Sequence, residues 1–412
     1  MPKNLLVITT LYPNKVQYRH GIFVETRLRY LLDSGQVNAK VIAPVPWFPS
    51  WSVFNNKRFS DYSQYTGVPK FEQRNGIDIY HPRYLVIPKI GMLLTPFFLA
   101  LSIFFAAKKV KKSGYQYDLV DCHYYYPDGV AVALVSRFLG KPFTVTARGT
   151  DINLIPEFKL PRRLIVRASQ KAAASITVCA ALKDRMVEIG AREDKIHVFR
   201  NGVNLELFRP MNQEQCKQRY QITRTTLLSV GHLIERKGHD KIIEAMAALP
   251  DCDLLIAGGG ELDAELKALV EKLGLSQQVR FLGELQQERL PELYNAVDIM
   301  VLASSREGWA NVLLESMACG TPVVATNIWG TPEVVNSPAA GVLVSERTGQ
   351  GIAEGVTELL QNFPSSEETR KYAEGFSWQQ TVSGLNSLFD KLTTGHREKI
   401  SSTADKAVKR AE

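Results

Sequence analysis

Two glutamates eight residues apart, Glu307 and Glu315, have the spacing in this sequence that points most clearly to chemistry. Glu307 stands in a loop after an apolar strand, and Glu315 stands one turn inside the following short helix. Their carboxylates supply strong acceptor oxygens, which suit vicinal hydroxyl groups. The plain alternative is a pair of solvated acids, since Glu is mostly exposed. The apolar Leu314 and Met317, and Gly308, which lets a ligand approach the backbone, weigh against that alternative.

The elements that must position these acids read as strand, loop, helix and strand. Residues 298–302 form an apolar strand-like run, and Asn311 predicts the N-cap of a helix. Residues 312–319 carry the 3.6-residue apolar period, and Gly320 predicts the helix stop. Another strand starts at Pro322. In open parallel sheets ligands lie at the carboxyl ends of strands, so this loop is expected to face a ligand.

Length, composition and charge predict a soluble protein of two domains with anionic partners. A chain of 412 residues, 45% hydrophobic and 22% charged, exceeds one ordinary core. The net charge of +8 favours nucleotide diphosphates, acidic polysaccharide or an anionic membrane surface as partners. We expect no nucleic-acid partner, since the sequence shows no RNA-binding aromatic motif, zinc spacing or basic recognition helix.

The expected compartment is the cytoplasm. The five cysteines are scattered and odd in number, which is typical of core residues in a reducing compartment. An apolar strand follows Asn4 at once, which leaves no room for a secretory signal peptide.

Residues 90–107 carry no charge and are followed by Lys108, Lys109, Lys111 and Lys112. This length is borderline for a membrane span, but Pro96 stands where a helix from Phe97 would begin. We expect a core helix and no spanning helix. The alternative left open is peripheral docking on the anionic inner face of the plasma membrane.

Three loops of the first half follow predicted strands and hold polar side chains. A helix N-terminus after the first loop favours a polar or anionic ligand, and the other two loops start at strand carboxyl ends. A solvated loop and a structural histidine are the plain alternatives. The candidates are Arg19, His20 and Gly21 in the first loop, His123 in the second, and Arg148 and Asp151 in the third. The long aromatic insertion at residues 47–76 is predicted to be a functional lid.

The second half opens with a loop that is suited to phosphate. A glycine-bounded loop with cations, entering a helix N-terminus, cradles phosphate through its backbone N–H groups. A solvated basic loop is the alternative. The residues are Gly231, His232, Arg236 and Lys237, and a glycine-rich turn at Gly259 follows the next strand.

The run Glu307-Gly308-Trp309-Ala310-Asn311 with Glu315 resembles the Glu-x7-Glu signature of the family 4 retaining glycosyltransferases. Residues 231–238 resemble that family's Gly-Arg-Leu-x-x-x-Lys-Gly loop, with His232 in place of the arginine. Residues 118–123 resemble its Asp-x-x-x-x-His segment. Arg148 stands where the family often has histidine, and residues 200–210 resemble its interdomain linker.

The resemblance implies an α/β protein of the GT-B fold, in which two Rossmann-like domains have parallel sheets facing across a cleft. It implies an acceptor-binding domain at residues 1–203 and a nucleotide-sugar domain at residues 204–375. A helix at about residues 376–392 would pack back on the first domain, and residues 393–412 would be a charged, frayed tail.

The resemblance also implies roles for the candidates. Glu315 would hold the ribose hydroxyls, Glu307 the sugar hydroxyls and Lys237 the diphosphate. The residues of the acceptor side would be Arg19, His20, Gly21, Arg148 and Asp151, and the insertion at residues 47–76 would be an acceptor-specific lid. The catalytic residues would be His123, Lys237 and Glu307, and the donor site would also include Gly231, His232, Arg236, Gly259, Gly308, Asn311 and Glu315. We expect no metal and no cofactor, because the nucleotide-sugar is a co-substrate.

The predicted activity is retaining transfer from a UDP- or GDP-sugar to a glycan or lipid-linked hydroxyl in cell-envelope synthesis. A nucleotide-sugar 2-epimerase of the same fold is the first alternative, and it would convert donor without acceptor. A non-catalytic sugar-binding protein is the second. The sugar, the base and the acceptor stay open at this point.

Overall fold

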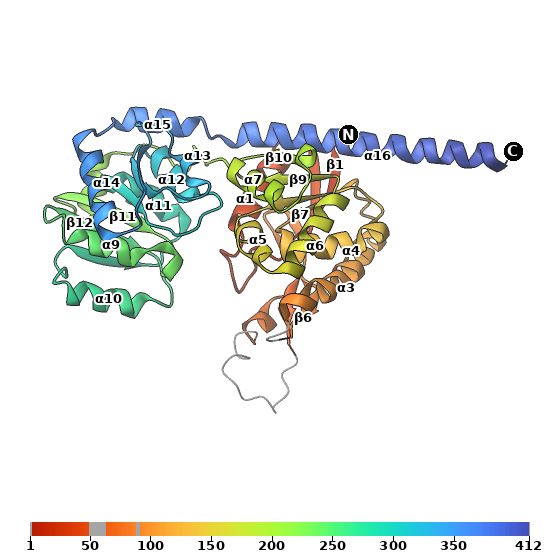
Figure 1. Cartoon of the computed structure of the whole chain (residues 1–412), viewed down its shortest axis with the longest axis horizontal. Helices are drawn as coiled ribbons and strands as arrows, with labels where there is room; N and C mark the ends of the chain where they lie inside the picture. The colour runs from red at the N-terminus through yellow and green to blue at the C-terminus, as the bar shows by residue number, and fades with distance from the viewer. Residues whose placement is uncertain (1, 49–62, 88–90, 412) are drawn as a thin grey trace, which may run out of the picture. The chain divides into compact units, whose positions relative to one another are not determined.

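The computed structural model describes residues 2–48, 63–87 and 91–411 of the chain. It contains two compact units (Figure 1). Unit 1 comprises Met1–Phe199 and Thr381–Glu412, and unit 2 comprises Arg200–Gln380. The sequence-based boundary lay at residues 203/204, a few residues from the first of these divisions.

Unit 1 is built on an eight-stranded sheet with the order β10-β9-β8-β7-β1-β2-β5-β4. Neighbouring strands are parallel except for β4 and β5. The inner strands β7 and β8 are buried along their whole length, as expected for a parallel sheet covered on both faces. The bounds are β1 (Lys3–Ile8), β2 (Val37–Ile42), β4 (Phe71–Arg74), β5 (Ile77–Tyr80), β7 (Leu119–His123), β8 (Phe143–Ala147), β9 (Ala174–Thr177) and β10 (Ile196–Val198), with β3 (Val45–Trp47) and β6 (Arg83–Leu85) as a separate parallel pair.

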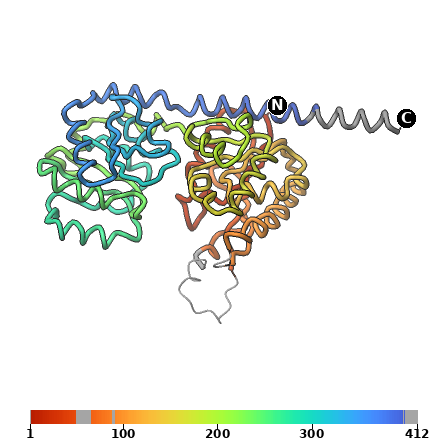
Figure 2. Tube along the Cα trace, viewed as in Figure 1, coloured from red at the N-terminus to blue at the C-terminus, as the bar shows by residue number. Residues whose placement is uncertain are grey.

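The helices of unit 1 include one from the end of the chain. Its residues Leu385 and Phe389 are fully buried in a core that also contains Leu5 of β1 and Leu28 of α1. The return of the chain to unit 1 can be followed in Figure 2. The bounds are α1 (Ile22–Asp33), α3 (Gly91–Lys112), α4 (Val130–Leu139), α5 (Thr150–Asn153), α6 (Lys159–Lys171), α7 (Ala180–Glu188) and α16 (Trp378–Ala411).

Unit 2 has a six-stranded parallel sheet with the order β13-β12-β11-β14-β15-β16. The chain runs outward in one direction from β11 and in the other from β14, so a topological switch point lies between these two strands. Ligands of such sheets bind at the carboxyl ends of the strands beside the switch point. The strands are β11 (Thr225–Val230), β12 (Cys252–Ala257), β13 (Val279–Gly283), β14 (Ile299–Leu302), β15 (Val323–Thr326) and β16 (Gly341–Val344).

The helices of unit 2 cover this sheet and bury a core that includes Ile242 of α9 and Val356 of α14. Their bounds are α8 (Gln213–Tyr220), α9 (His239–Met246), α10 (Asp263–Lys272), α11 (Leu290–Ala296), α12 (Asn311–Ala318), α13 (Thr331–Val334), α14 (Gly349–Gln361) and α15 (Ser366–Glu374).

Three local predictions were wrong. Helix α16 does not end near residue 392 but continues to Ala411. Asn311 is not the N-cap of α12, because the helix begins with Asn311 and Ala310 occupies the cap position. Helix α3 does not begin at Phe97. It begins at Gly91 and includes Pro96. Proline cannot donate to the carbonyl four residues earlier, and the Tyr126 hydroxyl donates to that carbonyl of Met92 instead.

The predicted aromatic lid is described only in part. Its residues 49–62, which include Trp51, Phe54, Phe59 and Tyr62, lie outside the described residues. The described part contains β3, the short 3₁₀ helix η1 (Ser63–Gly67) and β4.

Candidate functional site

The loop after β11 in unit 2 lies so close to the loop after β12 that Gly258 of the second loop has no room for a side chain. A Cβ atom on Gly258 would stand 1.8 Å from the Gly231 carbonyl oxygen. Leu233 N–H donates to the Gly259 carbonyl at 3.0 Å, which ties the two loops together. The predicted residues Gly231 and Gly259 therefore belong to one rigid backbone surface at the carboxyl ends of adjacent strands.

Lys237 and Glu307 meet across the switch point between β11 and β14. The Lys237 ammonium donates to Glu307 Oε1 at 2.6 Å. The Ser304 hydroxyl donates to the same oxygen at 2.8 Å. Residues 70 positions apart in the sequence are thus brought into one contact by the order of the strands.

Arg236 reinforces this pair. Its Nη1 donates to the Arg306 carbonyl at 2.9 Å and lies 3.3 Å from Glu307 Oε1. The guanidinium is therefore fixed at the same place as the Lys237 ammonium. Two cations beside one carboxylate leave positive charge to attract a phosphate group.

The Glu307 carboxyl is buried, with 9% of the residue exposed. Burial alone would raise its pKa, but Lys237 and Arg236 outweigh burial and hold the pKa below its usual value. The carboxylate is therefore ionised at neutral pH. All its hydrogen bonds to described residues use Oε1, so Oε2 remains for a ligand hydroxyl.

Glu315 has a different environment one turn inside α12. The Tyr294 hydroxyl lies 3.3 Å from Oε2 and the Gln287 amide 3.5 Å from Oε1, both longer than strong hydrogen bonds. Burial raises the pKa of the Glu315 carboxyl to about 7. This carboxyl is half protonated near neutral pH and has no short hydrogen bond from the protein. It is therefore suited to accept hydrogen bonds from the hydroxyl groups of a ligand.

The sequence analysis missed the histidine that supports the phosphate loop. His239 is buried at the start of α9, and burial lowers its pKa to about 4. Its Nε2 contacts the His232 carbonyl at 3.2 Å and its Nδ1 contacts the Ser229 hydroxyl at 2.9 Å. A neutral ring with the proton on Nε2 satisfies both contacts. The side chain of His232, which replaces the arginine of the motif, is exposed.

The other predicted donor residues lie on the same loops. Gly308 directly follows Glu307. Asn311 begins α12, and its Oδ1 accepts a hydrogen bond from Asn201 at 3.3 Å. Gly238 has a φ of +70°, and a Cβ atom there would stand 2.1 Å from the Ala303 carbonyl oxygen. This glycine permits the phosphate loop to pack against the end of β14.

In unit 1, His123 ends β7 at the switch point of that sheet, beside β1. It is 2% exposed, and burial lowers its pKa to about 3. Arg148 Nη2 donates to Nδ1 at 2.5 Å, and Nε2 lies 3.4 Å from Asp121 Oδ2. Asp121 also receives a hydrogen bond from Arg27 at 2.8 Å. Both ring nitrogens of the neutral histidine therefore face protein partners.

Arg148 and Asp151 have separate roles in the loop after β8. Burial lowers the pKa of the Arg148 guanidinium to about 9, and its side chain lies 5.0 Å from the centre of the Phe23 ring. The Asp151 carboxylate accepts backbone N–H groups of Tyr125, Arg148 and Gly149 at 2.8, 3.0 and 2.8 Å. Asp151 is fully buried, so it holds the loop in shape and does not face a ligand.

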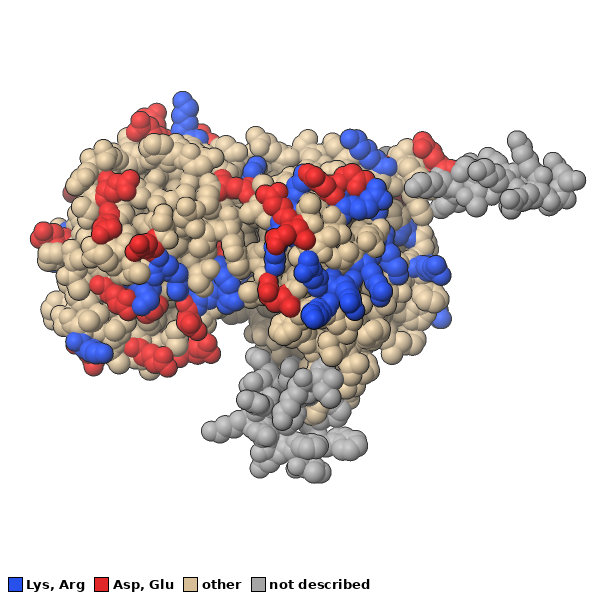
Figure 3. All heavy atoms as spheres, in the orientation of Figure 1, with Lys and Arg blue, Asp and Glu red and all other residues tan. Residues whose placement is uncertain are grey.

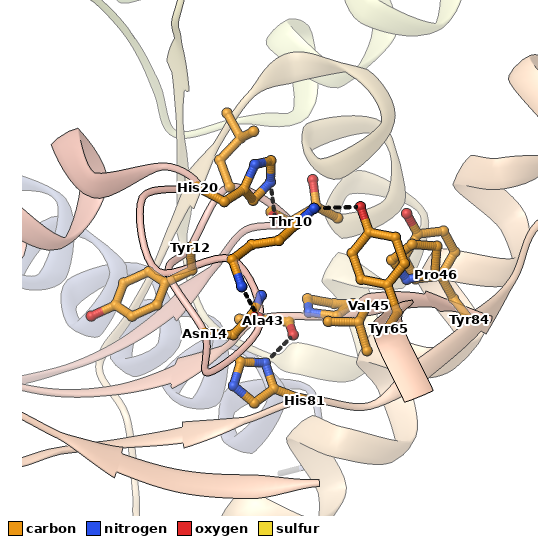
Figure 4. A pocket seen from close by; sticks show the side chains of 13 residues that line it. Thr10, Tyr12, Asn14, His20, Ala43, Val45, Pro46, Tyr65, His81 and Tyr84 are labelled. Atoms are coloured by element: carbon orange, nitrogen blue, oxygen red, sulfur yellow. Dashed lines mark hydrogen bonds between the residues drawn. The ribbon is translucent and has the colours of Figure 1, made fainter. Parts of the chain in front are cut away.

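The first loop of unit 1 borders a cavity of about 220 Å³ that is drawn in Figure 4. Of the three predicted loop residues only His20 lines it, with Nε2 3.1 Å from the Thr10 carbonyl. Arg19 lies over the ring of Tyr18, and Gly21 packs with a φ of +69° against the backbone of Leu11.

His81 lines the same cavity and was not predicted from the sequence. Its Nδ1 lies 2.9 Å from the Ala43 carbonyl and its Nε2 lies 2.8 Å from Glu72 Oε1. In Figure 4 a dashed line joins His81, at the bottom of the view, to the Ala43 carbonyl, and Tyr65 and Tyr84 lie to the right. The cavity therefore combines aromatic walls with hydroxyl and imidazole groups.

No group of three or more His, Cys, Asp and Glu side chains among the described residues has the arrangement needed to hold a metal ion. The cations that contact Glu307 are Lys237 and Arg236.

Known families match both halves of the chain. The model described as "Glycosyltransferase Family 4" matches residues 45–207, and the model "Glycosyl transferases group 1" matches residues 212–376. Together the two matches cover most of both units.

Among similar proteins, the "putative teichuronic acid biosynthesis glycosyltransferase TuaC" of Bacillus subtilis is 25% identical, over 86% of this chain and 88% of its own. "D-inositol 3-phosphate glycosyltransferase 1" of Catenulispora acidiphila is 29% identical, over 71% and 76%. Of solved structures, sucrose-phosphate synthase from Thermosynechococcus elongatus has a TM-score of 0.77 at 18% identity, covering 95% of this chain and 100% of its own. Anabaena HepE in complex with UDP has a TM-score of 0.70 at 20% identity with the same coverage.

Proposed function

Because this chain belongs to the family 4 glycosyltransferases with the GT-B fold, we propose that it is a retaining enzyme that uses a UDP- or GDP-sugar as donor. The acceptor is a hydroxyl group on a lipid-linked or polysaccharide intermediate of cell-envelope synthesis, made in the cytoplasm. The observation that carries the donor assignment is the Lys237–Glu307 contact at the switch point of unit 2, with Glu315 on the next helix. The solved structure of HepE in complex with UDP makes UDP the first nucleotide to test.

Unit 2 binds the nucleotide-sugar donor through its ribose and its diphosphate. Glu315 accepts hydrogen bonds from the ribose hydroxyls, because its carboxyl has only long hydrogen bonds in the free protein. The diphosphate lies on the loop from Gly231 to Gly238, where Lys237 and Arg236 provide positive charge. Fixed cations of this kind stabilise the charge that develops on a leaving diphosphate.

Glu307 positions the donor sugar. Its Oε1 is occupied by Lys237 and Ser304, so Oε2 receives a sugar hydroxyl. The sugar is then held by the same carboxylate that contacts the Lys237 ammonium. Glu307 is thus a contact residue here, and we assign it no role as a nucleophile.

The transfer step needs no protein nucleophile. The bond from the anomeric carbon to the phosphate oxygen breaks, and the acceptor oxygen bonds to the same face of that carbon. The acceptor proton passes to the leaving phosphate, which acts as the base. Lys237 stabilises the leaving group, so the step requires no metal, and activity is expected to survive chelation by EDTA.

In unit 1 we assign His123 to the donor sugar, and Arg19, His20, Gly21 and Arg148 to the acceptor side. In the free protein both ring nitrogens of His123 have protein partners, Arg148 and Asp121. The cavity beside His20 provides aromatic and hydroxyl groups of the kind that sugars contact.

Thermal-shift measurements with UDP, GDP, ADP and their common sugars test the donor assignment. A ligand at 100 times its Kd adds about 2.7 kcal/mol to the free energy of unfolding. We expect a shift with one base in the wild type and in Glu374→Ala, whose side chain is exposed on α15, and none in Glu315→Ala. Equal shifts in all three proteins would overturn the assignment of Glu315.

Incubation of the donor alone separates transfer from epimerisation. A glycosyltransferase releases nucleotide only slowly without an acceptor, whereas an epimerase converts the sugar at full rate. Nuclear magnetic resonance of the product made with a hydroxyl acceptor reads the anomeric configuration. Inversion at the anomeric carbon would contradict the retaining mechanism.

A further inference from the structure

One face of α3 in unit 1 carries large apolar side chains that are exposed to solvent. Phe97, Leu101 and Phe105 are 51%, 56% and 60% exposed. Their spacing of four residues places them along one side of the helix. Lys108 and Lys112, at spacings of three and four residues, continue the same line and are also exposed. The outer side of α3 is therefore an apolar stripe that ends in cations.

Helix α4 extends this stripe into a patch. It packs beside α3 and exposes Leu134 and Phe138, the latter by 70%. The Phe104 ring meets the rings of Phe105 and Phe138 edge to face, with centroids 5.3 and 5.4 Å away. The apolar patch is defined by Phe97, Leu101, Phe104, Phe105, Leu134 and Phe138. Patches of this kind on otherwise soluble units mark interaction sites.

The charged side chains of the helices that carry and adjoin the apolar patch all have one sign. Helices α3, α4 and α6 contain ten Lys and Arg residues and no Asp or Glu, whereas the whole chain has a net charge of +8. The basic excess of the protein therefore lies on these three neighbouring helices. Helix α6 packs beside α4 and exposes Arg162, Arg163 and Arg167. Figure 3 shows Lys and Arg side chains gathered on the face of unit 1 that carries α6.

The inner side of α3 belongs to the core of unit 1. Leu99, Ile103 and Val110 are fully buried. Among the described helices α3 is the one that has the length and hydropathy of a membrane span, and 39% of its most apolar window is buried. Withdrawing the helix into a bilayer would strip that core, so α3 can meet lipid only with its outer side.

We propose that the apolar patch docks unit 1 on an anionic lipid surface, with α3 lying parallel to the membrane plane. The aromatic and leucine side chains enter the boundary between headgroups and acyl chains, while the cations of α3, α4 and α6 contact lipid phosphates. This goes beyond the proposed function, because donor binding by unit 2 does not require it.

A second copy of the chain is a poor occupant for the same surface. A twofold contact places the same surface of each copy against the other. The cations around the two patches would then face one another without acids to pair with them, and like charges in contact oppose association. An anionic bilayer offers both the apolar interior and the complementary charge.

Sedimentation with lipid vesicles tests the proposal on the full chain without any donor. Wild-type protein is expected to sediment with vesicles of phosphatidylcholine and phosphatidylglycerol, and much less with phosphatidylcholine alone or at high salt. Replacing Phe97, Leu101 and Phe105 by Ser, or Lys108, Lys112 and Arg137 by Ser, is expected to weaken binding at least about tenfold. Phe363→Ser with Lys371→Ser, both exposed in unit 2, is the matched control and retains binding.

A fluorescent label reports where the contact forms. All five cysteines are buried, so a new cysteine in Leu101→Cys can be labelled selectively with an environment-sensitive dye. Its emission is expected to shift to the blue on addition of anionic vesicles. The same label in Leu273→Cys, at an exposed site of unit 2, is expected not to shift.

Three results would overturn the proposal. They are wild-type protein that stays in solution with every vesicle, patch variants that sediment as well as wild type, and a dimer in vesicle-free solution that the patch variants abolish. Donor-induced thermal shifts recorded on the same variants show whether they are folded and keep donor binding apart from docking.

Discussion

The Lys237 ammonium and the Glu307 carboxylate lie 2.6 Å apart, with 13% and 10% of their side chains exposed. Each residue comes from the carboxyl end of a different strand, β11 and β14, on the two sides of the switch point. The pair is therefore a contact between two segments of the free protein, and in the proposed function the diphosphate binds beside it.

Replacing Lys237 by Ala is expected to lower kcat by about 10²–10³, because the ammonium group that stabilises the leaving diphosphate is lost. It also leaves Glu307 with one cation fewer, so the free energy of unfolding should fall by about 1–3 kcal/mol. Steady-state kinetics and urea unfolding measure the two effects.

A double-mutant cycle with Glu307→Gln checks that the two side chains act together. The double variant should lose less stability than the sum of the single variants, with a coupling of about 0.5–3 kcal/mol. Lys241→Ala, which breaks a surface pair with Glu244, serves as control and should cost at most about 1 kcal/mol. Additive effects at Lys237 and Glu307 would contradict the pairing.

Glu315→Gln is expected to make the donor-free protein more stable at pH 8 and to leave it nearly unchanged at pH 5. The pKa of Glu315 is about 7 in the folded protein, above the usual value of a carboxyl. The folded state therefore holds the proton more tightly, and the stability from this group is lost as pH rises to 7 and above. Thermal unfolding at the two pH values measures the difference, of about 1–3 kcal/mol.

The same pKa predicts a pH dependence of donor binding. The ribose hydroxyls need the ionised carboxylate, so nucleotide-sugar affinity should weaken by about tenfold from pH 8 to pH 6 in the wild type. Calorimetric titration with Glu315→Gln, whose amide does not ionise, provides the reference. The same pH dependence in both proteins would assign the effect to another group.

Gly238→Ala is expected to destabilise unit 2 far more than Gly274→Ala. Both glycines have a φ near +70°, so alanine costs about 1–2 kcal/mol at either position through the left-handed backbone alone. At Gly238 the new Cβ would also stand 2.1 Å from the Ala303 carbonyl, whereas at Gly274 nothing lies within 4 Å. Urea unfolding of the two variants separates the steric effect from the backbone effect, and equal losses would refute the close packing of the loop.

Arg148→Met is expected to raise the pKa of His123 by about one unit or more. The guanidinium adds to the effect of burial in disfavouring the imidazolium, and Asp121, which favours it, remains after the substitution. A nuclear magnetic resonance titration of the histidine rings measures this, with His123→Gln to assign the signal. An unchanged pKa would mean that Arg148 does not control the charge state of the ring.

The sequence by itself determined the repeating strand–loop–helix order, because β-rich apolar runs ending in glycine or polar turns are local signals. It also placed Lys237, Glu307 and Glu315 at the carboxyl ends of strands or one turn beyond them. Local sequence patterns were enough to predict this placement, because all parallel strands have their carboxyl ends at one edge of the sheet.

Only the tertiary structure decided how those groups are used, since contacts between distant segments leave no local pattern. It made Arg148 and Asp121 the partners of His123. Burial raises the pKa of Glu315, whereas Lys237 and Arg236 outweigh burial at Glu307 and hold its pKa below the usual value.

The same holds for the helix that the sequence left ambiguous. The pattern of α3 shows apolar residues all round, so it cannot say which side is buried. Packing against α4 and β6 buries Leu99 and Ile103 and leaves Phe97, Leu101 and Phe105 outside. The Tyr126 hydroxyl donates to the Met92 carbonyl, which Pro96 leaves without its helical partner, so the helix can continue through Pro96. The exposed stripe thus depends on partners far away in the sequence, and only the folded chain brings them together.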